Sequence, residues 1–98
     1  MNNKDYTMFI FRLQPHTIHM RWNGMTKNEQ RYIEIGLRIA YYRKKNGMTQ
    51  EQLAERIGIS SGYLSQVETP SFVQPISLKT LFAVADVFEI PPSKLLDD

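Results

Sequence analysis

The residues whose type and spacing could suggest a metal site are two histidines, His16 and His19, which stand three residues apart. A helix would bring both imidazoles to one face, but the preceding Pro15 does not favour a helix at this point. Two histidines also fall short of the about three or four protein ligands that a zinc ion requires. We therefore expect no metal site and no cofactor.

The acidic side chains do not form a catalytic pair either. Glu51 and Glu55 lie one helical turn apart, but beside Arg56 they are typical of a solvated helix face. No nucleophile stands beside a base with the spacing of a known enzyme family, and no glycine-rich loop could cradle a phosphate. The lack of cysteine excludes disulfides and thiolate metal sites. The sequence therefore predicts a protein that is not an enzyme.

Charge and length limit the remaining classes of function. The 98 residues suffice for one small domain, and the formal net charge is +2. From Arg31 to the end, eight lysines and arginines balance eight acidic residues, so a nucleic-acid surface would depend on local placement of charge. The longest apolar run, Met8 to Phe11, is far too short to cross a bilayer. We expect a cytoplasmic protein without membrane contact.

The stretch from Thr49 to Glu68 must position whatever recognition chemistry the chain has. A single helix cannot bring its apolar residues to one face, whereas two short helices with a bend at Gly58 can. Those residues are Leu53, Ile57, Ile59, Leu64 and Val67. Gly58 supplies the positive φ of a sharp helix end. Ala54 is the small residue that a close crossing of two helices needs.

Short polar signals mark where the helices begin. Thr49 and Gln52 form a capping box, so the first helix of the pair is expected to begin near Gln50. Ser60 is expected to cap the second helix, and Ser77 a later one.

Three further helices are expected around this pair. One runs from about Glu29 to Asn46 and buries the stripe Ile35, Ile39 and Tyr42. Another follows Ser77, and its inward stripe comprises Leu78, Leu81, Val84, Ala85 and Phe88. Residues 93–96 form a last helical turn, with Leu95 packed inward.

The segments TQEQLAERIGIS and PISLKTLFAVADVF resemble the phage repressor and Cro family of DNA-binding domains, also called the Xre family. The resemblance covers roughly residues 33–96 and implies an all-α, five-helix bundle with a helix-turn-helix. Residues 25–98 are then expected to form the DNA-binding domain. Residues 1–24 are expected to be an extension outside it, as an arm, a hairpin or a disordered segment.

The resemblance implies that the second helix of the pair enters the major groove of double-stranded DNA. The positions that read base edges are then Ser61, Gly62 and Gln66, and the outward-facing Ser65 joins them. Gln66 has the best chemistry, because its amide can donate and accept together and so match adenine N6 and N7. Ser61 can bond to several bases, while Gly62 permits close approach.

Phosphate contacts are expected around the same helix pair. Gln50 and Ser60 sit at helix N-termini, where free N–H groups suit a phosphate, although capping alone would also explain Ser60. Tyr63 could stack on a sugar of the DNA backbone, contact a thymine methyl group, or pack against its neighbours at the rim of the core, which we favour slightly. Secondary candidates, for which an ordinary solvated surface is the alternative, are Thr69, Lys44 and Lys45.

Arg43 also has two interpretations, a phosphate contact or an internal ion pair. By the resemblance, an arginine at this place pairs with the glutamate that closes the recognition helix, which here is Glu68. We favour the internal Arg43–Glu68 pair, which leaves Arg38, Lys44 and Lys45 as the solvent-facing charges.

Together these features predict a sequence-specific transcriptional regulator, in particular a repressor, that binds an inverted repeat as a homodimer. Candidates for the dimer contact, each of which could equally complete the core, are Phe82, Val87 and Leu96. The alternative is a protein-interaction module, such as an antitoxin or anti-repressor, that uses the same fold to bind a protein partner. Near-neutral charge and the bare Gly62 favour that alternative, whereas the basic cluster and Gln66 oppose it.

Overall fold

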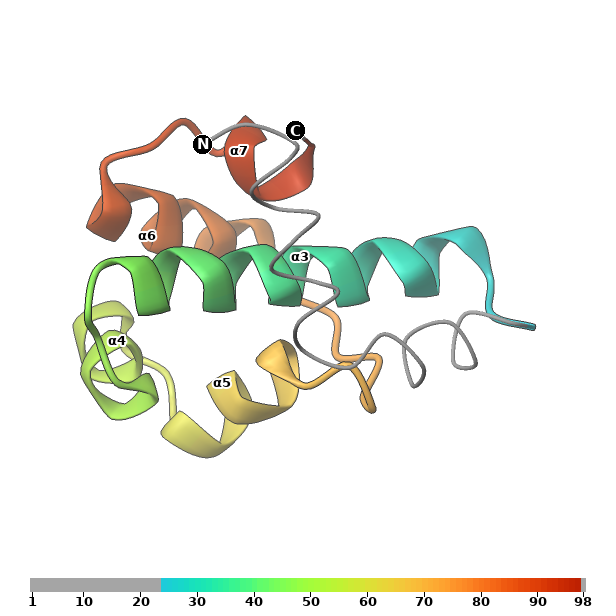
Figure 1. Cartoon of the computed structure of the whole chain (residues 1–98), viewed down its shortest axis with the longest axis horizontal. Helices are drawn as coiled ribbons and strands as arrows, with labels where there is room; N and C mark the ends of the chain where they lie inside the picture. The colour runs from blue at the N-terminus through green and yellow to red at the C-terminus, as the bar shows by residue number, and fades with distance from the viewer. Residues whose placement is uncertain (1–23, 98) are drawn as a thin grey trace.

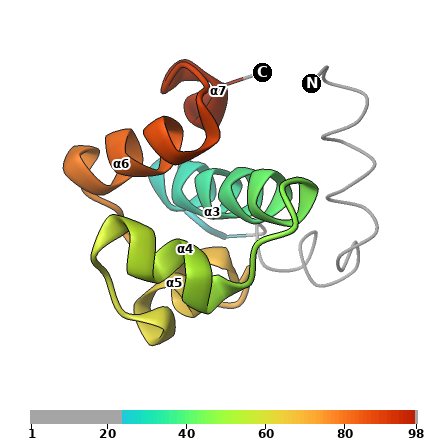
Figure 2. The same ribbon diagram turned by 90° about the vertical axis from the view of Figure 1, so that its left-hand side faces the viewer.

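The computed structural model describes residues 24–97, and over this range the chain forms five α-helices and no β-strand. In chain order they are α3 (Lys27–Lys45), α4 (Gln50–Ile57), α5 (Ser61–Glu68), α6 (Leu78–Phe88) and α7 (Ser93–Leu96). α3 runs through the middle, with α4 and α5 on one side and α6 and α7 on the other (Figures 1 and 2). The expected all-α, five-helix bundle is confirmed for these residues. The expected extension, residues 1–24, lies outside the described range apart from Gly24.

Short-range signals fix the helix ends. Thr49 Oγ1 accepts from the Gln52 N–H at 3.1 Å, and Gln52 Oε1 accepts from the Thr49 N–H at 2.8 Å. Ser60 and Ser77 cap α5 and α6 with their hydroxyl oxygens. Gly58 ends α4 with a φ of 76°, in the left-handed region that favours glycine. The predicted caps and the predicted bend are therefore confirmed.

The main core lies where α3, α4, α5 and α6 meet. The predicted α3 stripe, Ile35, Ile39 and Tyr42, is buried there, and α7 contributes the fully buried Leu95. The predicted α6 stripe is buried at Leu81, Val84, Ala85 and Phe88.

The prediction that Leu78 belongs to the buried stripe of α6 is wrong, because its side chain is 63% exposed. It is the first residue of α6, and the three residues to Leu81 advance a helix by about 300°. Leu78 therefore stands at the edge of the stripe, on the same face as the exposed Phe82 one turn later.

α3 and α5 approach each other closely at Gly36. A Cβ atom at this position would overlap the carbonyl oxygen of Val67, so the backbones of the two helices are in contact. The sequence analysis assigned the small residue of a close crossing to Ala54, which is buried between α4 and its neighbours. Gly36 is a second such residue that it missed, and it sets how closely α5 lies against α3.

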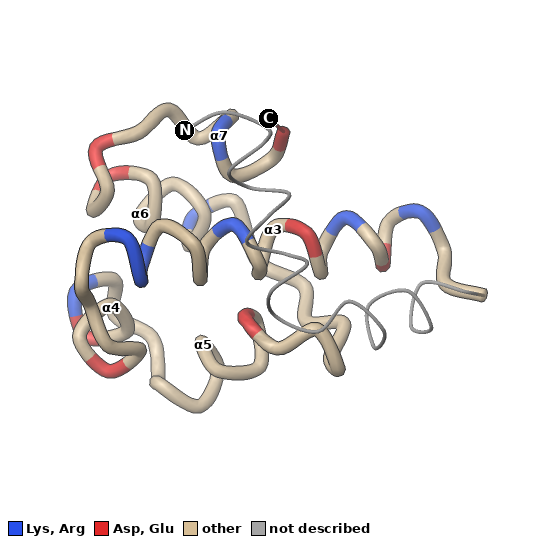
Figure 3. The backbone as a smooth tube through the Cα atoms, viewed as in Figure 1, with Lys and Arg blue, Asp and Glu red and all other residues tan. Residues whose placement is uncertain are grey.

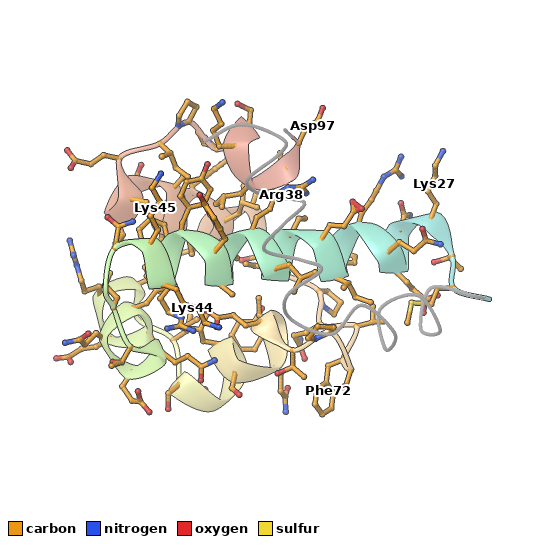
Figure 4. The ribbon with its side chains drawn as sticks, viewed as in Figure 1. Lys27, Arg38, Lys44, Lys45, Phe72 and Asp97 are labelled. Carbon is orange, nitrogen blue, oxygen red and sulfur yellow. The ribbon has the colours of Figure 1, made fainter. Side chains whose placement is uncertain are left out.

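Arg38 is buried against α7 and does not face solvent, so the prediction for this side chain is wrong. Its Nη1 donates to the carbonyl oxygen of Leu96 at 3.3 Å, and the side chain extends from α3 toward α7 in Figure 4. The reason is that α7, the last described helix, covers this side of α3. None of the described helices combines the length and the apolar character needed to cross a bilayer.

Candidate nucleic-acid interface

The four predicted base-reading residues lie on the side of α5 that faces away from the core. Ser61, Gly62 and Gln66 are exposed, and Ser65 is half-buried. The opposite side of the helix is buried through Leu64, Val67 and Glu68. A helix that buries one side and exposes hydroxyl and amide groups on the other is suited to hydrogen bonding with a large polar partner.

The electrostatics around α5 are nearly neutral. No lysine or arginine occurs in α5, and its one charged residue, Glu68, is buried at the C-terminal end (Figure 3). α4 carries Glu51 and Glu55 with Arg56, while basic residues gather at the end of α3 (Figure 3). Attraction of an anionic partner would therefore come from beside α5 and not from the helix itself.

Three of the predicted phosphate-contacting residues come together in one pocket beside α5. Lys44, Gln50 and Thr69 line a cavity of about 180 Å³, together with Ala40, Arg43, Glu68 and Pro70. The Gln50 Nε2 donates to Glu68 Oε1 at 3.0 Å, and the Thr69 hydroxyl donates to the Ser65 carbonyl oxygen at 2.6 Å. Lys44 extends toward the α4 and α5 side of the fold in Figure 4. These contacts hold polar groups from three segments around one small opening.

A buried ion pair forms the inner wall of this pocket. Arg43 Nε donates to Glu68 Oε2 at 2.8 Å, and Arg43 Nη2 donates to Glu68 Oε1 at 2.9 Å. A third donor, Nη1, reaches the carbonyl oxygen of Met48 at 2.7 Å. Both side chains are almost fully buried, so the guanidinium is committed to joining α3 with the end of α5. Of the two interpretations of Arg43, the structure has the internal ion pair with Glu68. The guanidinium is therefore not placed to contact a phosphate.

The other predicted phosphate residues do not join the pocket. Lys45 Nζ lies 5.8 Å from the centre of the Tyr41 ring, and in Figure 4 it points away from Lys44. The Ser60 hydroxyl accepts from the Tyr63 N–H at 3.0 Å as the cap of α5.

Tyr63 packs at the rim of the core. Its hydroxyl donates to the Pro75 carbonyl oxygen at 2.9 Å, and its ring lies partly buried against the core. Burial raises the pKa of the Tyr63 phenol above its ordinary value, because the charged form is poorly solvated there. These contacts tie α5 to the loop that leads into α6.

Phe72 borders the same surface and was not among the predicted site residues. It is exposed in the loop after α5 and projects away from the fold, as Figure 4 shows. Proline cannot continue a helix, so Pro70 and Pro75 mark a loop, and a large apolar residue within that loop is the signal that could have marked Phe72.

The helix order, the α4–α5 pair and the exposed polar face of α5 define a helix-turn-helix domain. The chain belongs to the helix-turn-helix family of the Xre type, whose sequence profile matches residues 39–95. The resemblance noted from TQEQLAERIGIS and PISLKTLFAVADVF is thus confirmed.

Two curated relatives are similar to this chain. The HTH-type transcriptional regulator SinR of Bacillus subtilis (strain 168) is 38% identical over 64 residues, and SinR of Bacillus licheniformis is 36% identical over 64 residues. Each match covers 65% of this chain and 57% of the relative. The chain therefore spans little more than half the length of these two regulators.

Two solved structures are similar as well. The N-terminal DNA binding domain of SinR from Bacillus subtilis shares 38% identity with a TM-score of 0.59, over 65% of this chain and 91% of that one. The restriction-modification controller protein C.AhdI from Aeromonas hydrophila shares 28% identity with a TM-score of 0.59, over 65% of this chain and 94% of that one. The described domain therefore corresponds to nearly the whole of each of these two structures.

Proposed function

We propose that this chain is a sequence-specific DNA-binding transcriptional regulator whose α5 lies in the major groove. The outward face of α5 carries the proposal, because polar side chains and a bare glycine stand exposed on a helix held from behind. The major groove is about 12 Å wide and admits one α-helix. The relatives support the proposal, since SinR is a transcriptional regulator with a DNA binding domain.

Each exposed residue of α5 has a distinct part in this proposal. Gln66 pairs with an adenine through its amide, and Ser61 and Ser65 make single hydrogen bonds to neighbouring bases. Gly62 lets the helix approach the base edges closely, because it has no side chain on a face where a Cβ would point into open space.

Phosphate contacts come from the margin of α5. Lys44, Gln50 and Thr69 hold one phosphate at their shared pocket, and the N-terminus of α5 at Ser60 faces another. Lys45 takes no part, since its ammonium group lies over the Tyr41 ring on the other side of α3.

The regulator acts as a homodimer on an inverted repeat, with half-sites about 34 Å apart on one face of the duplex. Support comes from apolar side chains exposed on the last helices, where Phe82 is 47% and Leu96 is 50% exposed. Leu78 adds to the same apolar surface, whereas Val87 packs partly against the core. Such a dimer represses transcription by occupying a promoter. The protein acts in the cytoplasm.

Selection of bound sequences from a random duplex pool tests the proposal, with Gln66→Ala examined beside the parent protein. We expect enrichment of an inverted repeat, and a preference that relaxes at one symmetric pair of positions in the variant, worth about 1–3 kcal/mol per base pair. Gln30→Ala is the matched control, because Gln30 lies on α3 and donates to the Met25 carbonyl oxygen. A folded parent protein that enriches no sequence would overturn the proposal.

A protein-interaction module, such as an antitoxin or anti-repressor, is the second candidate. The lack of any lysine or arginine in α5 and the exposed Phe72 beside it favour this alternative. Retardation of bulk duplex DNA at low salt separates the two, because a DNA reader keeps a nonspecific affinity that falls steeply as salt rises. No retardation at low salt would favour the protein-interaction module.

A further inference from the structure

Residues 69–75 lead away from α5 and form a loop that is hydrogen-bonded to this helix at both ends. At the start of the loop, the Thr69 hydroxyl donates to the Ser65 carbonyl oxygen at 2.6 Å. At its end, the Pro75 carbonyl oxygen accepts from the Tyr63 hydroxyl at 2.9 Å. These two hydrogen bonds fix the place of the loop relative to α5.

A turn within this loop presents Phe72 to solvent. The Phe72 N–H donates to the Thr69 carbonyl oxygen at 3.0 Å, and Pro70 takes the second position of the turn, where its fixed φ is favourable. The next residue, Val73, packs inward against α3. The Phe72 side chain is 50% exposed, and in Figure 4 it points away from α3 on the α5 side of the fold. The fold therefore holds an aromatic ring in a fixed place on the side that the outer face of α5 occupies.

The chain from α5 through this loop supplies no cationic side chain. No lysine or arginine occurs between Arg56 and Lys79, and the one acidic residue in this stretch, Glu68, is buried. A DNA strand that lies against the loop must therefore be met by neutral groups. The deoxyriboses of such a strand offer apolar C–H surface between the phosphates, and this surface suits an aromatic ring.

We propose that Phe72 packs against a deoxyribose at the edge of the major groove, an inference that rests on the proposed function. Two sugar–phosphate strands bound the groove, so a chain that leaves the C-terminal end of a helix in the groove passes one of them. Phe72 follows that end by four residues, which span at most about 14 Å. The contact removes apolar surface of the ring and of the sugar from water. It adds affinity without reading a base or neutralising a phosphate.

The exposed part of the ring is large enough for a measurable effect. A phenylalanine side chain buries about 150–250 Å² when it is fully enclosed, so half exposure leaves about 100 Å² available. At about 25 cal/mol per Å², burial of about 55 Å² of this surface corresponds to about a tenfold change in affinity. We therefore expect about a tenfold contribution from the ring.

Phe72→Ala in the full chain tests the contact by fluorescence anisotropy with labelled duplex DNA over a salt series. We expect about tenfold lower affinity at each salt concentration and an unchanged slope of log affinity against log salt, because no phosphate contact is lost. Phe72→Leu keeps an apolar side chain and should lose less. Ser71→Ala is the matched control, since Ser71 is the exposed neighbour in the same turn, and it should bind as the parent does. Circular dichroism checks that each variant is folded.

Intermolecular nuclear Overhauser effects locate the ring in the complex of the parent protein, so this measurement does not depend on the folding of any variant. We expect contacts from the Phe72 ring protons to the deoxyribose protons of one strand. Contacts to the base protons of two adjacent base pairs would mean that the ring inserts between them, and would overturn the packing against a sugar.

The remaining outcomes separate this contact from the proposed function. Equal affinity of the parent and Phe72→Ala for duplex DNA would overturn the contact, leave the proposed function standing and free the ring for a protein partner. Equal losses in Phe72→Ala and Ser71→Ala would overturn it by assigning the effect to the turn. A smaller salt slope in Phe72→Ala would overturn it as well, because the ring would then act through a phosphate contact. A folded parent without affinity for duplex DNA would overturn both proposals.

Discussion

The two sides of α5 differ in how strictly the fold constrains them. On the side that faces α3, Val67 lies in backbone contact with Gly36, and Glu68 accepts two hydrogen bonds from Arg43 within the protein interior. On the outer side, Gly62 has nothing within 4 Å of its would-be Cβ, and Gln66 is exposed. The first side determines where the helix lies, and the second determines what it can contact.

This difference separates stability from recognition along a helix of only eight residues. Inner substitutions should change the free energy of unfolding, because they disturb close packing or leave a buried charge unpaired. Outer substitutions should change DNA preference and should not destabilise the domain, because no packing or buried charge is disturbed there. The variants below test that separation, beginning with the largest expected effect.

Glu68→Ala should destabilise the domain most. It leaves the buried Arg43 guanidinium without its carboxylate partner, and removal of one member of a buried ion pair costs about 3–5 kcal/mol. Urea unfolding followed by circular dichroism measures the loss. Glu55→Ala on the exposed side of α4 is the control and should change the unfolding midpoint little. A Glu68→Ala protein as stable as the parent, with an altered DNA preference, would show that the inner side of α5 does not determine stability separately from recognition.

Gly36→Ala and Gly62→Ala form a pair in which one substitution has opposite effects on the two sides. At Gly36 the added methyl group meets the Val67 carbonyl, so α5 must shift, at a cost of about 3 kcal/mol. At Gly62 the methyl group enters open space within a helix and should stabilise it by about 0.5–1 kcal/mol. Both values follow from the midpoint of urea unfolding. Destabilisation of similar size at both positions would contradict the comparison.

Local signals in the sequence were sufficient for the helix ends and for most of the core. The Thr49 capping box, the bend at Gly58 and the cap at Ser60 each depend on groups within about four residues, so they can be predicted without the fold. The burial of Leu95 also followed from its pattern. Base reading by Gln66 stays a prediction, because it concerns a contact with DNA and not a contact within the fold.

Long-range geometry explains what the sequence analysis missed. Gly36 meets a backbone 31 positions later in the chain, a contact that no local pattern records. Arg38 was expected to face solvent, because the position of α7 over it depends on the whole bundle. Leu78 was assigned to the core because a periodic pattern does not show where a helix leaves its neighbours. Ile33 and Leu37 of α3, by contrast, are buried at a four-residue spacing that is visible in the sequence and was overlooked.

Lys44→Gln sharpens the comparison at the margin of α5, where we expect a moderate effect on DNA binding and none on folding. Loss of one phosphate contact should lower nonspecific affinity and reduce the slope of log affinity against log salt by about one. Lys45→Gln is the matched control, because Lys45 points to the other side of α3 (Figure 4). Fluorescence anisotropy with labelled duplex DNA over a salt series measures both slopes. Equal changes in the two variants would mean that the pocket does not bind a phosphate.

Tyr63→Phe probes the boundary between the two sides and should have the smallest effect. The variant loses one partly exposed hydrogen bond to the Pro75 carbonyl oxygen, worth about 0.5–1 kcal/mol at neutral pH. The raised pKa of Tyr63 gives the effect a pH dependence, because the fold favours the neutral phenol. The stability that this preference contributes is complete below the unfolded pKa of about 10 and is lost as pH rises through the higher folded value.

The difference in unfolding free energy between the parent and Tyr63→Phe isolates this group from the other tyrosines. Urea unfolding at neutral pH and at several values above about pH 10 should show the advantage of the parent shrinking as pH rises. The loss of that advantage follows from ionisation of the phenol in the unfolded chain before it ionises in the folded one. A constant difference across this range would mean that the Tyr63 phenol is as well solvated in the fold as in the unfolded chain, and would place Tyr63 on the outer side of α5.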